Sequence, residues 1–431
     1  MRFPGRIAAA IEVLAEVETR RRPVAEALKS WGLANRFAGA GDRAAIGNLV
    51  YDALRRRASH AWAMDADDPR SLILSVVVRE WGETPDGLAA AFSGDAHAPA
   101  PLSDEEVARL SAIEPLAGAP DHIRGDVPEW VAPFLAESLG PDWVAEAAAM
   151  GARPPLDLRV NTLKSTPQRV LKSLQRFHPE PAAVSPVGIR IPAGHGDSRT
   201  PNVQTDEAWL KGWFEVQDQG SQIAALLAGA EAGEQVLDLC AGAGGKSLAM
   251  AAAMQNKGQI FAHDSDRARL APIYDRLKRA GVRNVQVVPP APGALDALVD
   301  RMDRVVVDAP CTGSGTWRRR PDAKWKLSAE QVAARVGEQQ TLLAEGARFV
   351  KPGGALVYIT CSILPQENVE QADRFISSHP DFSLVAGHSL WHRHFAGNSA
   401  RVLLPAAGGV VLTPHSTGTD GFYVMLATRR S

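Results

Sequence analysis

Val236-Leu237-Asp238-Leu239-Cys240-Ala241-Gly242-Ala243-Gly244-Gly245-Lys246-Ser247 is the most informative segment of this chain. Its first residues are typical of a buried strand, which runs into a glycine-rich turn and then into an alanine-rich helix. Further short apolar runs alternate with helical patterns downstream, at residues 259–263, 285–288, 304–308, 355–360, 409–412 and 421–427. This regular alternation predicts a doubly wound, Rossmann-like α/β sheet with right-handed crossovers.

Two other kinds of region precede this segment. Apolar residues at three- and four-residue spacings, such as Ile46, Leu49 and Val50, predict a helical bundle over residues 6–64, and helical patterns continue to residue 139. Residues 156–163 and 187–191, around a helix near 167–177, predict a small α+β module. We therefore expect an all-helical domain with an acidic helical linker over residues 1–145, the α+β module over 146–230 and the doubly wound domain over 231–431.

Composition excludes several classes of protein. The chain has 431 residues, of which 45% are hydrophobic and 22% charged, as in ordinary globular proteins. Its three cysteines, Cys240, Cys311 and Cys361, can neither staple a secreted scaffold nor build a four-cysteine zinc site. No apolar run reaches the roughly 18 residues of a membrane span, and the early run over residues 7–17 contains two glutamates. We expect a cytoplasmic monomer that uses no metal and contacts no membrane.

Three classes of cofactor are candidates for the glycine-rich turn. A Walker A loop needs glycine where Cys240 stands, and a dinucleotide fingerprint needs glycine where Ser247 stands, so neither phosphate cradle is complete. The remaining candidate is S-adenosylmethionine, whose ribose hydroxyls would be bound by an acidic residue after the second strand, and Asp264 stands there. Every doubly wound fold needs a glycine-rich first turn, so a purely structural interpretation of the turn stays open as well.

All three cysteines fall at the carboxyl ends of expected strands, and so in one crevice. A single cysteine of this kind is usually a small core residue, but three of them together indicate chemistry. C5 of a pyrimidine is a poor nucleophile, and a thiolate that adds to C6 turns the ring into an enamine able to attack a methylsulfonium. An acidic side chain beside the base, such as Asp308, would stabilise the charge that develops.

These residues resemble the RNA cytosine-C5 methyltransferases of the RsmB/NOL1/NSUN (Fmu/Sun) family. The matching segments are residues 216–222, 238–247, 308–315 with 318–325, 358–362 with 365–368, and 419–422. The resemblance implies Cys361 as the nucleophile on C6, Cys311 as the thiol that assists product release, and Asp308 beside the base. It also implies cofactor contacts from Cys240, Ala241, Gly242, Ala243, Gly244, Gly245, Lys246, Asp264 and Asp308. Lys246 can equally be a helix-cap cation without a catalytic part.

The resemblance also implies ribosomal RNA as the partner. Residues 158–164 resemble the small RNA-binding module of the family, and residues 41–43 and 49–57 resemble the NusB-like domain of its bacterial ribosomal enzyme, which favours ribosomal over transfer RNA. Lys and Arg exceed Asp and Glu over residues 1–60 and 151–431, so either end permits a polyanionic partner. The RNA contacts implied come from Arg159, Asn161, Lys164, Arg318 and Arg319. The expected activity is methylation of C5 of a cytosine in ribosomal RNA, of the small subunit, with S-adenosylmethionine.

Several alternatives stay open. The family usually carries an aspartate after the third strand, whereas residues 287–291 offer no carboxylate, so a catalytically impaired RNA-binding protein derived from the family is one alternative. The presence of both Cys311 and Cys361 disfavours it. A transfer RNA cytosine-C5 methyltransferase is a second alternative, and a nucleotide-binding α/β enzyme is a third, which the Walker A mismatch disfavours. His388 and His392 are spaced to share a helix face, but no acidic partner for a metal stands nearby.

Overall fold

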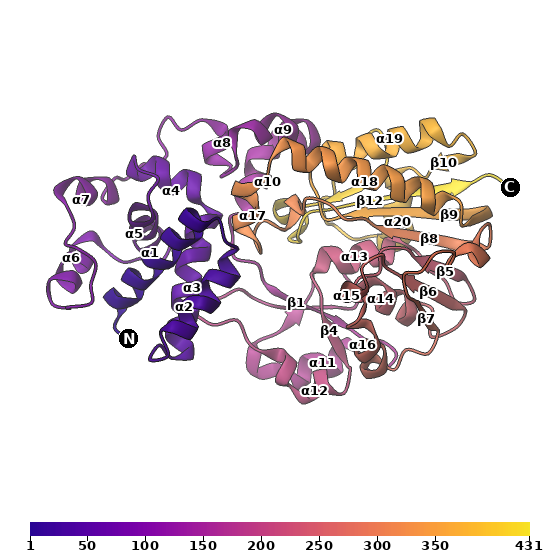
Figure 1. Ribbon diagram of the computed structural model, residues 1–431, viewed down its shortest axis with the longest axis horizontal. Helices are drawn as coiled ribbons and strands as arrows, with labels where there is room; N and C mark the ends of the chain where they lie inside the picture. The colour runs from indigo at the N-terminus through magenta and orange to yellow at the C-terminus, as the bar shows by residue number, and fades with distance from the viewer.

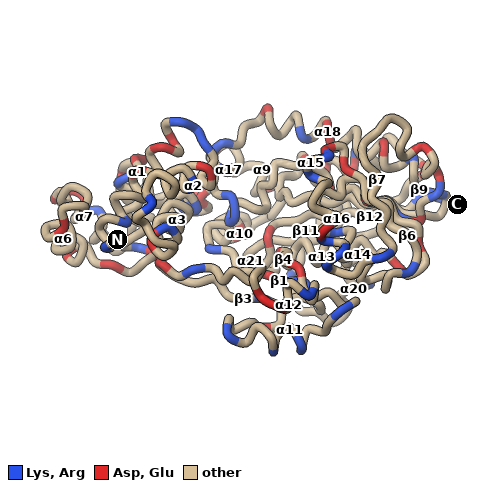
Figure 2. Tube along the Cα trace, turned by 60° about the horizontal axis from the view of Figure 1, so that its bottom comes forward, with Lys and Arg blue, Asp and Glu red and all other residues tan.

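The N-terminal region is entirely helical (Figure 1). The computed structural model describes all 431 residues. Each helix of this region has an apolar side, and these sides pack into one core around Ile7, Leu49 and Leu72. Figure 2 shows Asp and Glu residues around the last two of these helices, within the acidic stretch of the sequence. The helices are α1 (Phe3–Arg20), α2 (Val24–Ala34), α3 (Ala40–Arg55), α4 (Arg57–Met64), α5 (Pro69–Arg79), α6 (Pro85–Ser93) and α7 (Asp104–Leu110).

A helical linker leads from this bundle to the rest of the chain. It consists of α8 (Asp121–Arg124), η1 (Glu129–Val131), α9 (Ala132–Leu139), η2 (Gly140–Asp142) and α10 (Trp143–Ala149). Val131, Leu135 and Leu139 are buried in the core of the C-terminal domain. The linker therefore packs with that domain, although the sequence analysis groups it with the N-terminal region.

The small module is an antiparallel sheet covered by short helices. Its strands lie in the order β2-β3-β1-β4, and Leu158, Ile189 and Phe214 are buried beneath the helices. The first helix begins where Thr166 accepts a hydrogen bond from the Arg169 backbone N–H. The elements are β1 (Leu156–Val160), α11 (Pro167–Ser173), η3 (Gln175–Phe177), β2 (Glu180–Pro181), β3 (Gly188–Ile191), η4 (Val203–Thr205), α12 (Glu207–Leu210) and β4 (Phe214–Val216).

The C-terminal domain is built on a sheet with the strand order β10-β12-β9-β8-β5-β6-β7. Strands β5 to β9 are parallel to one another, while β10 and β11 pair antiparallel with β12, which itself pairs antiparallel with β9. The strands are β5 (Gln235–Asp238), β6 (Gln259–His263), β7 (Val285–Val288), β8 (Met302–Asp308), β9 (Val350–Thr360), β10 (Phe382–Leu384), β11 (Val410–Leu412) and β12 (Phe422–Arg429). The chain runs from β5 outward to β7 and then returns to β8 on the other side of β5. This reversal is where ligands bind in doubly wound sheets.

Helices cover both faces of this sheet. Ile223, Met250 and Leu390 contribute to the core on one face, and Leu343 and Phe375 to the core on the other. The helices are α13 (Gln219–Leu227), α14 (Gly245–Ala253), α15 (Arg267–Leu270), α16 (Ile273–Ala280), η5 (Asp296–Leu298), η6 (Ser314–Thr316), α17 (Pro321–Lys326), α18 (Ala329–Ala347), η7 (Pro365–Glu367), α19 (Val369–Ser378), α20 (Gly387–Phe395) and α21 (Pro414–Thr417). The predicted doubly wound domain, α+β module and helical N-terminal region are confirmed. No helix of the chain is both long and apolar enough to cross a membrane.

Helix α17 of the C-terminal domain docks against the N-terminal bundle (Figure 1). Lys324 Nζ donates to the Arg55 carbonyl at 2.8 Å, and Trp325 Nε1 donates to the Leu54 carbonyl at 2.6 Å. These carbonyls belong to the last turn of α3, where they lack partners within the helix. In return, Arg55 Nε donates to the Arg318 carbonyl at 2.7 Å. The bundle is thereby fixed to the segment that follows β8.

Candidate active site

The turn between β5 and α14 is held open by glycine and fixed by backbone hydrogen bonds. Gly242 and Gly244 have φ angles of 50° and 80°, in the left-handed region, and a Cβ on Gly244 would lie 2.5 Å from the Ile273 side chain. The Ala241 N–H donates to the His263 carbonyl at 2.7 Å, and the Gly244 N–H donates to the Ala241 carbonyl at 2.8 Å. The predicted cofactor segment is therefore a rigid backbone cradle.

Asp264 lies directly beside this cradle, after β6, as the sequence predicts. Its carboxylate accepts hydrogen bonds from the Gly242 and Asp266 backbone N–H groups, both at 2.9 Å, and its side chain is 2% exposed. Arg269 Nη1 lies 3.4 Å from the same carboxylate. Because each carboxylate oxygen can accept two hydrogen bonds, these contacts leave acceptor capacity for a ligand hydroxyl. Asp264 thus joins the end of β6 to the glycine-rich turn.

Lys246 and Asp308 form an ion pair across the crevice. Lys246 Nζ donates to Asp308 Oδ2 at 2.6 Å and lies 5.4 Å from the centre of the Phe422 ring. The Lys246 side chain is 6% exposed and that of Asp308 is 32% exposed. Lys246 is therefore not a solvated helix-cap cation, because its charge is buried against Asp308 at the end of β8.

Asp238 is a functional candidate that the sequence analysis left without a role of its own. It is fully buried at the end of β5, and burial raises its pKa to about 7. Ser247 Oγ donates to Oδ2 at 2.6 Å, whereas Oδ1 has no partner. Its position after a run of apolar residues is the signal that could have identified it. An unpartnered buried oxygen beside the cradle suits a site that binds a polar ligand.

Cys311 and Cys361 meet at the ends of β8 and β9. Their Sγ atoms lie 3.3 Å apart, and both cysteines are half-buried and unbridged. The neighbouring Cys361 thiol and burial hold the pKa of Cys311 well above its usual range. Cys240 is buried in the core of the domain, and burial raises its pKa as well. Two of the three cysteines are thus brought together, and the third packs as a small core residue.

Glu367 holds the two cysteine loops in place, a role that the sequence analysis missed. It is fully buried and accepts hydrogen bonds from the Thr312 backbone N–H at 2.8 Å and the Ser362 hydroxyl at 2.5 Å. Gln339 Nε2 donates to it at 3.0 Å. Thr312 and Ser362 each follow one of the two cysteines in the chain. The Pro365-Gln366-Glu367-Asn368 segment resembles a family motif, but no pattern in it predicts contacts with residues about 50 positions away.

Arg318 and Arg319, predicted to contact RNA, are paired within the protein. Arg318 is 4% exposed and forms ion pairs with Asp218 and Asp420, and Arg319 pairs with the same two carboxylates. The adjacent Gly421 N–H donates to the Gly315 carbonyl at 2.7 Å. These contacts connect α13, the loop after β8 and the start of β12. A direct contact of either arginine with RNA stays a prediction.

The other three residues predicted to bind RNA lie where the small module meets α16. Asn161 Nδ2 donates to the Gly212 and Ala280 carbonyls at 2.9 and 2.8 Å, and Lys164 Nζ donates to the Arg279 carbonyl at 2.6 Å. Arg159 is 4% exposed, and burial lowers its pKa to about 10. Asn161 and Lys164 thus have structural contacts, whereas two guanidinium nitrogens of Arg159 are buried without a hydrogen-bond partner. Contact of the three residues with RNA stays a prediction.

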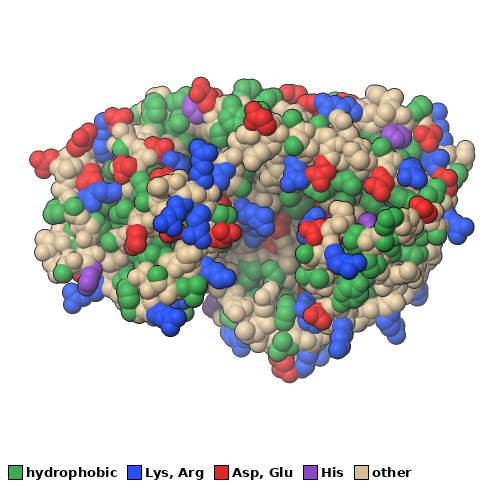
Figure 3. Space-filling model, viewed as in Figure 1, with side chains coloured by type: hydrophobic (Ala, Val, Ile, Leu, Met, Phe, Trp, Pro, Cys, Tyr) green, Lys and Arg blue, Asp and Glu red, His purple; other side chains and the backbone are tan.

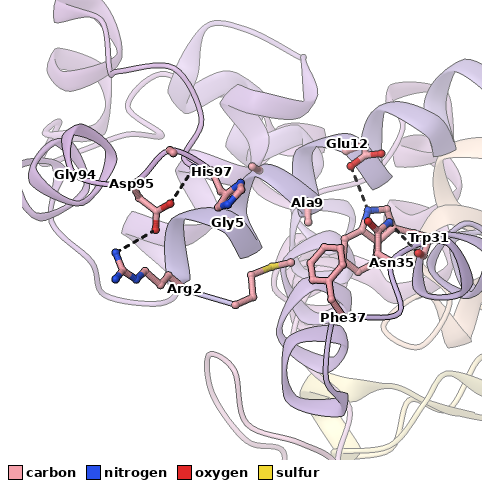
Figure 4. Close-up of a pocket in the computed structure, with 13 residues that line it drawn as sticks. Arg2, Gly5, Ala9, Glu12, Trp31, Asn35, Phe37, Gly94, Asp95 and His97 are labelled. Atoms are coloured by element: carbon pink, nitrogen blue, oxygen red, sulfur yellow. Dashed lines mark hydrogen bonds and ion pairs between the residues drawn. The ribbon is translucent and has the colours of Figure 1, made fainter.

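No other part of the chain matches this crevice in chemistry. His388 and His392 stack with ring centres 5.7 Å apart, and no group of three His, Cys, Asp or Glu side chains could hold a metal ion. A cavity of 630 Å³ lies in the N-terminal bundle, beside Trp31 and Phe37, and none of its lining residues belongs to the predicted sites (Figure 4). Figure 3 shows a hollow near the middle of the molecule, with Lys and Arg side chains on its N-terminal side.

The chain matches two family models. Residues 224–427 match the 16S rRNA methyltransferase RsmB/F model, and residues 127–195 match the ferredoxin-like domain of the RsmF/B-like methyltransferases. Together the two segments make up more than half of the chain.

Curated relatives and one solved structure agree with these matches. The probable ribosomal RNA small subunit methyltransferase B of Synechocystis is 29% identical, and ribosomal RNA small subunit methyltransferase B of Citrobacter koseri is 32% identical. Each alignment covers 69% of this chain and 65% of the relative, so the chain spans slightly less than two thirds of the length of these proteins. The crystal structure of PH0851 superimposes with a TM-score of 0.71 at 24% identity and covers 99% of both chains, which supports the fold.

Proposed function

This chain belongs to the 16S rRNA methyltransferase RsmB/F family, and from this we propose that it methylates C5 of a cytosine in small-subunit ribosomal RNA. The family depends on S-adenosylmethionine, which supplies an electrophilic methyl group on a sulfonium. The relatives named above are small-subunit ribosomal RNA methyltransferases, which supports ribosomal RNA as the substrate class.

The residues around the glycine-rich turn fit S-adenosylmethionine. Gly242 and Gly244 keep the backbone free of side chains, and Asp264 retains acceptor capacity for ribose hydroxyls beside them. Asp238 adds a buried carboxyl oxygen without a partner. In this proposal residues 240–246, Asp264 and Asp308 hold the cofactor.

The 3.3 Å contact between Cys311 and Cys361 is the observation that carries the proposal. Methylation at C5 needs a thiolate that adds to C6, and later a proton must leave C5 so that the thiolate can be eliminated. We assign C6 attack to Cys361 and assistance of product release to Cys311, as the resemblance to the RNA cytosine-C5 methyltransferases implies, and the contact between the two thiols supports their action on one base.

We assign Asp308 to binding of the target cytosine. Its carboxylate is fixed by Lys246 at the end of β8, the strand that leads to Cys311, and it remains 32% exposed to the crevice. A carboxylate at this position can accept a hydrogen bond from the exocyclic amine of cytosine while charge develops on the ring. Its removal should slow the attack on C6 as well as the transfer of the methyl group.

The domains before the sheet are assigned to RNA binding in this proposal. Residues 1–145 would form a NusB-like domain and residues 146–230 a second RNA-binding module, with an excess of Lys and Arg over residues 1–60 as support. Binding to RNA through phosphate contacts should weaken as salt rises, because counterions are released on association.

A methyl-transfer assay with mapping tests the proposed function. Purified protein is incubated with methyl-labelled S-adenosylmethionine and either small-subunit ribosomal RNA, intact small subunits or transfer RNA, and the labelled nucleoside is identified and located. We expect 5-methylcytosine in ribosomal RNA with the wild-type chain and none with Cys361→Ala. Label in transfer RNA alone would favour the transfer RNA enzyme. RNA binding without any label would favour the impaired binding protein.

A further inference from the structure

Helix α16 lies between the small module and the glycine-rich turn, and it contacts both (Figure 1). Arg276, in the middle of this helix, donates from Nη1 to the Ala243 carbonyl at 2.7 Å. Through Nη2 the same guanidinium donates to Glu215 Oε2, on β4 of the small module, at 3.1 Å. A single side chain therefore connects the small module to the turn that is assigned to the cofactor.

The Ala243 carbonyl fixes the orientation of one peptide plane in the glycine-rich turn. It shares a planar peptide unit with the Gly244 N–H, which donates to the Ala241 carbonyl at 2.8 Å. Arg276 and Ala241 thus fix both sides of one peptide plane, next to the left-handed Gly244. Ile273, one turn earlier on α16, fills the space that a Cβ on Gly244 would occupy. Two residues on successive turns of helix α16, Ile273 and Arg276, therefore support the glycine-rich segment.

The small module in turn holds α16 in place. Lys164 Nζ and Asn161 Nδ2 donate to the carbonyls of Arg279 and Ala280, which end the helix and would otherwise lack partners. Glu215 is 5% exposed and is shared between Arg276 and Arg279. The position of the module therefore sets the position of α16, and with it the position of Arg276.

We propose that Arg276 is a positioning residue for the cofactor turn, and that through Glu215 it makes cofactor affinity depend on the docking of the small module. This inference rests on the proposed function, because it takes the turn to be the S-adenosylmethionine site. Loss of the guanidinium leaves the Ala243 carbonyl without its partner and frees the peptide plane that the cofactor contacts. Arg276 itself touches only protein groups, so it acts by orienting the backbone.

Calorimetric titration with S-adenosylhomocysteine tests this role without methyl transfer. We expect Arg276→Met to raise the Kd about 10-fold, because the freed peptide plane must be ordered again when the ligand binds. Arg279→Met is the matched control, because Arg279 pairs with the same Glu215 one turn later and has no hydrogen bond to the turn. Its Kd should stay within about twofold of wild type. In steady-state assays Arg276→Met should raise KM for S-adenosylmethionine and leave KM for RNA unchanged.

The outcomes separate this inference from the proposed function. A wild-type chain that binds no S-adenosylhomocysteine would overturn both. Wild-type binding with an unchanged Kd in Arg276→Met would overturn the inference alone. An equal rise in Kd in Arg279→Met would also overturn it, because loss of an ion pair with Glu215 would then explain the effect without the hydrogen bond to Ala243. If Arg276→Met does not fold, Arg276→Gln carries the same test, since its shorter polar side chain cannot span from Glu215 to Ala243.

Discussion

Asp238 should make the stability of the C-terminal domain depend on pH. Its side chain is fully buried with one oxygen unpartnered, and burial raises its pKa from 3.8 to about 7. Below pH 3.8 the carboxyl is protonated in both the folded and the unfolded chain. As pH rises from there, the unfolded chain ionises first, so the contribution of Asp238 to folding stability falls until the folded-state pKa is passed.

The size of this effect follows from the difference between the pKa of Asp238 in the unfolded chain and in the folded chain. One pH unit corresponds to about 1.4 kcal/mol, so Asp238 should cost the folded chain about 4 kcal/mol between pH 4 and pH 7. Asp238→Asn cannot ionise, and its amide oxygen can still accept from Ser247. The stability of the variant relative to wild type should therefore rise by about this amount over that range and then level off above pH 7.

Urea unfolding at a series of pH values measures this difference. With an m-value of about 3 kcal/mol per molar, the unfolding midpoint of Asp238→Asn should move up by about 1 M relative to wild type between pH 4.5 and pH 8. Asp275→Asn, at an exposed position on α16, controls for the loss of one carboxyl. A midpoint difference between Asp238→Asn and wild type that does not change with pH would refute a buried, uncharged Asp238.

Three further variants probe the crevice and its supports. Asp264→Ala should raise the Kd for S-adenosylmethionine at least about 10-fold in calorimetry, because it removes the proposed ribose acceptor and leaves the Gly242 N–H unpaired; equal affinities would place the ribose elsewhere. Trp325→Phe should keep an aromatic side chain but lose the hydrogen bond to the Leu54 carbonyl, at a cost of about 1 kcal/mol of folding stability. The melting temperature should fall by a few degrees, and an unchanged melting temperature would show that α17 does not need this hydrogen bond for docking. Arg318→Met should cost about 3–5 kcal/mol, measured by urea unfolding, because it leaves Asp218 and Asp420 buried with only Arg319; a cost below 1 kcal/mol would contradict the buried network.

Two strands of the parallel sheet could be predicted closely from short runs rich in apolar and β-branched residues. Residues 259–263 and 285–288 form β6 and β7 with the predicted bounds, although both strands are only partly buried and β7 lies at the edge of the sheet. The three-residue strands β4 and β10 were missed, because three residues are too few to show an alternation. Their pairing depends on neighbours that are distant in the sequence.

The site was predicted in part for a similar reason. Cys311 and Cys361 could be placed together because both follow parallel strands, and the carboxyl ends of such strands share one edge. Glu367 and Arg276 could not be found in this way, because their importance lies in contacts between segments whose relative positions only the folded chain defines. The resemblance implies Arg318 as an RNA contact, yet its partners Asp218 and Asp420, about 100 residues away on either side, bury it within the protein.

The proposed covalent mechanism is tested most directly by trapping the protein on RNA. Each purified cysteine variant is incubated with ribosomal RNA and S-adenosylmethionine, run on a denaturing gel, and any adduct is digested and analysed by mass spectrometry. Cys311→Ala should accumulate an adduct in which Cys361 is attached to a cytosine, because attack and methyl transfer proceed while release stalls. Cys361→Ala should give no adduct and no 5-methylcytosine. An adduct in Cys361→Ala but not in Cys311→Ala would reverse the two roles, and full activity in both variants would contradict covalent catalysis itself.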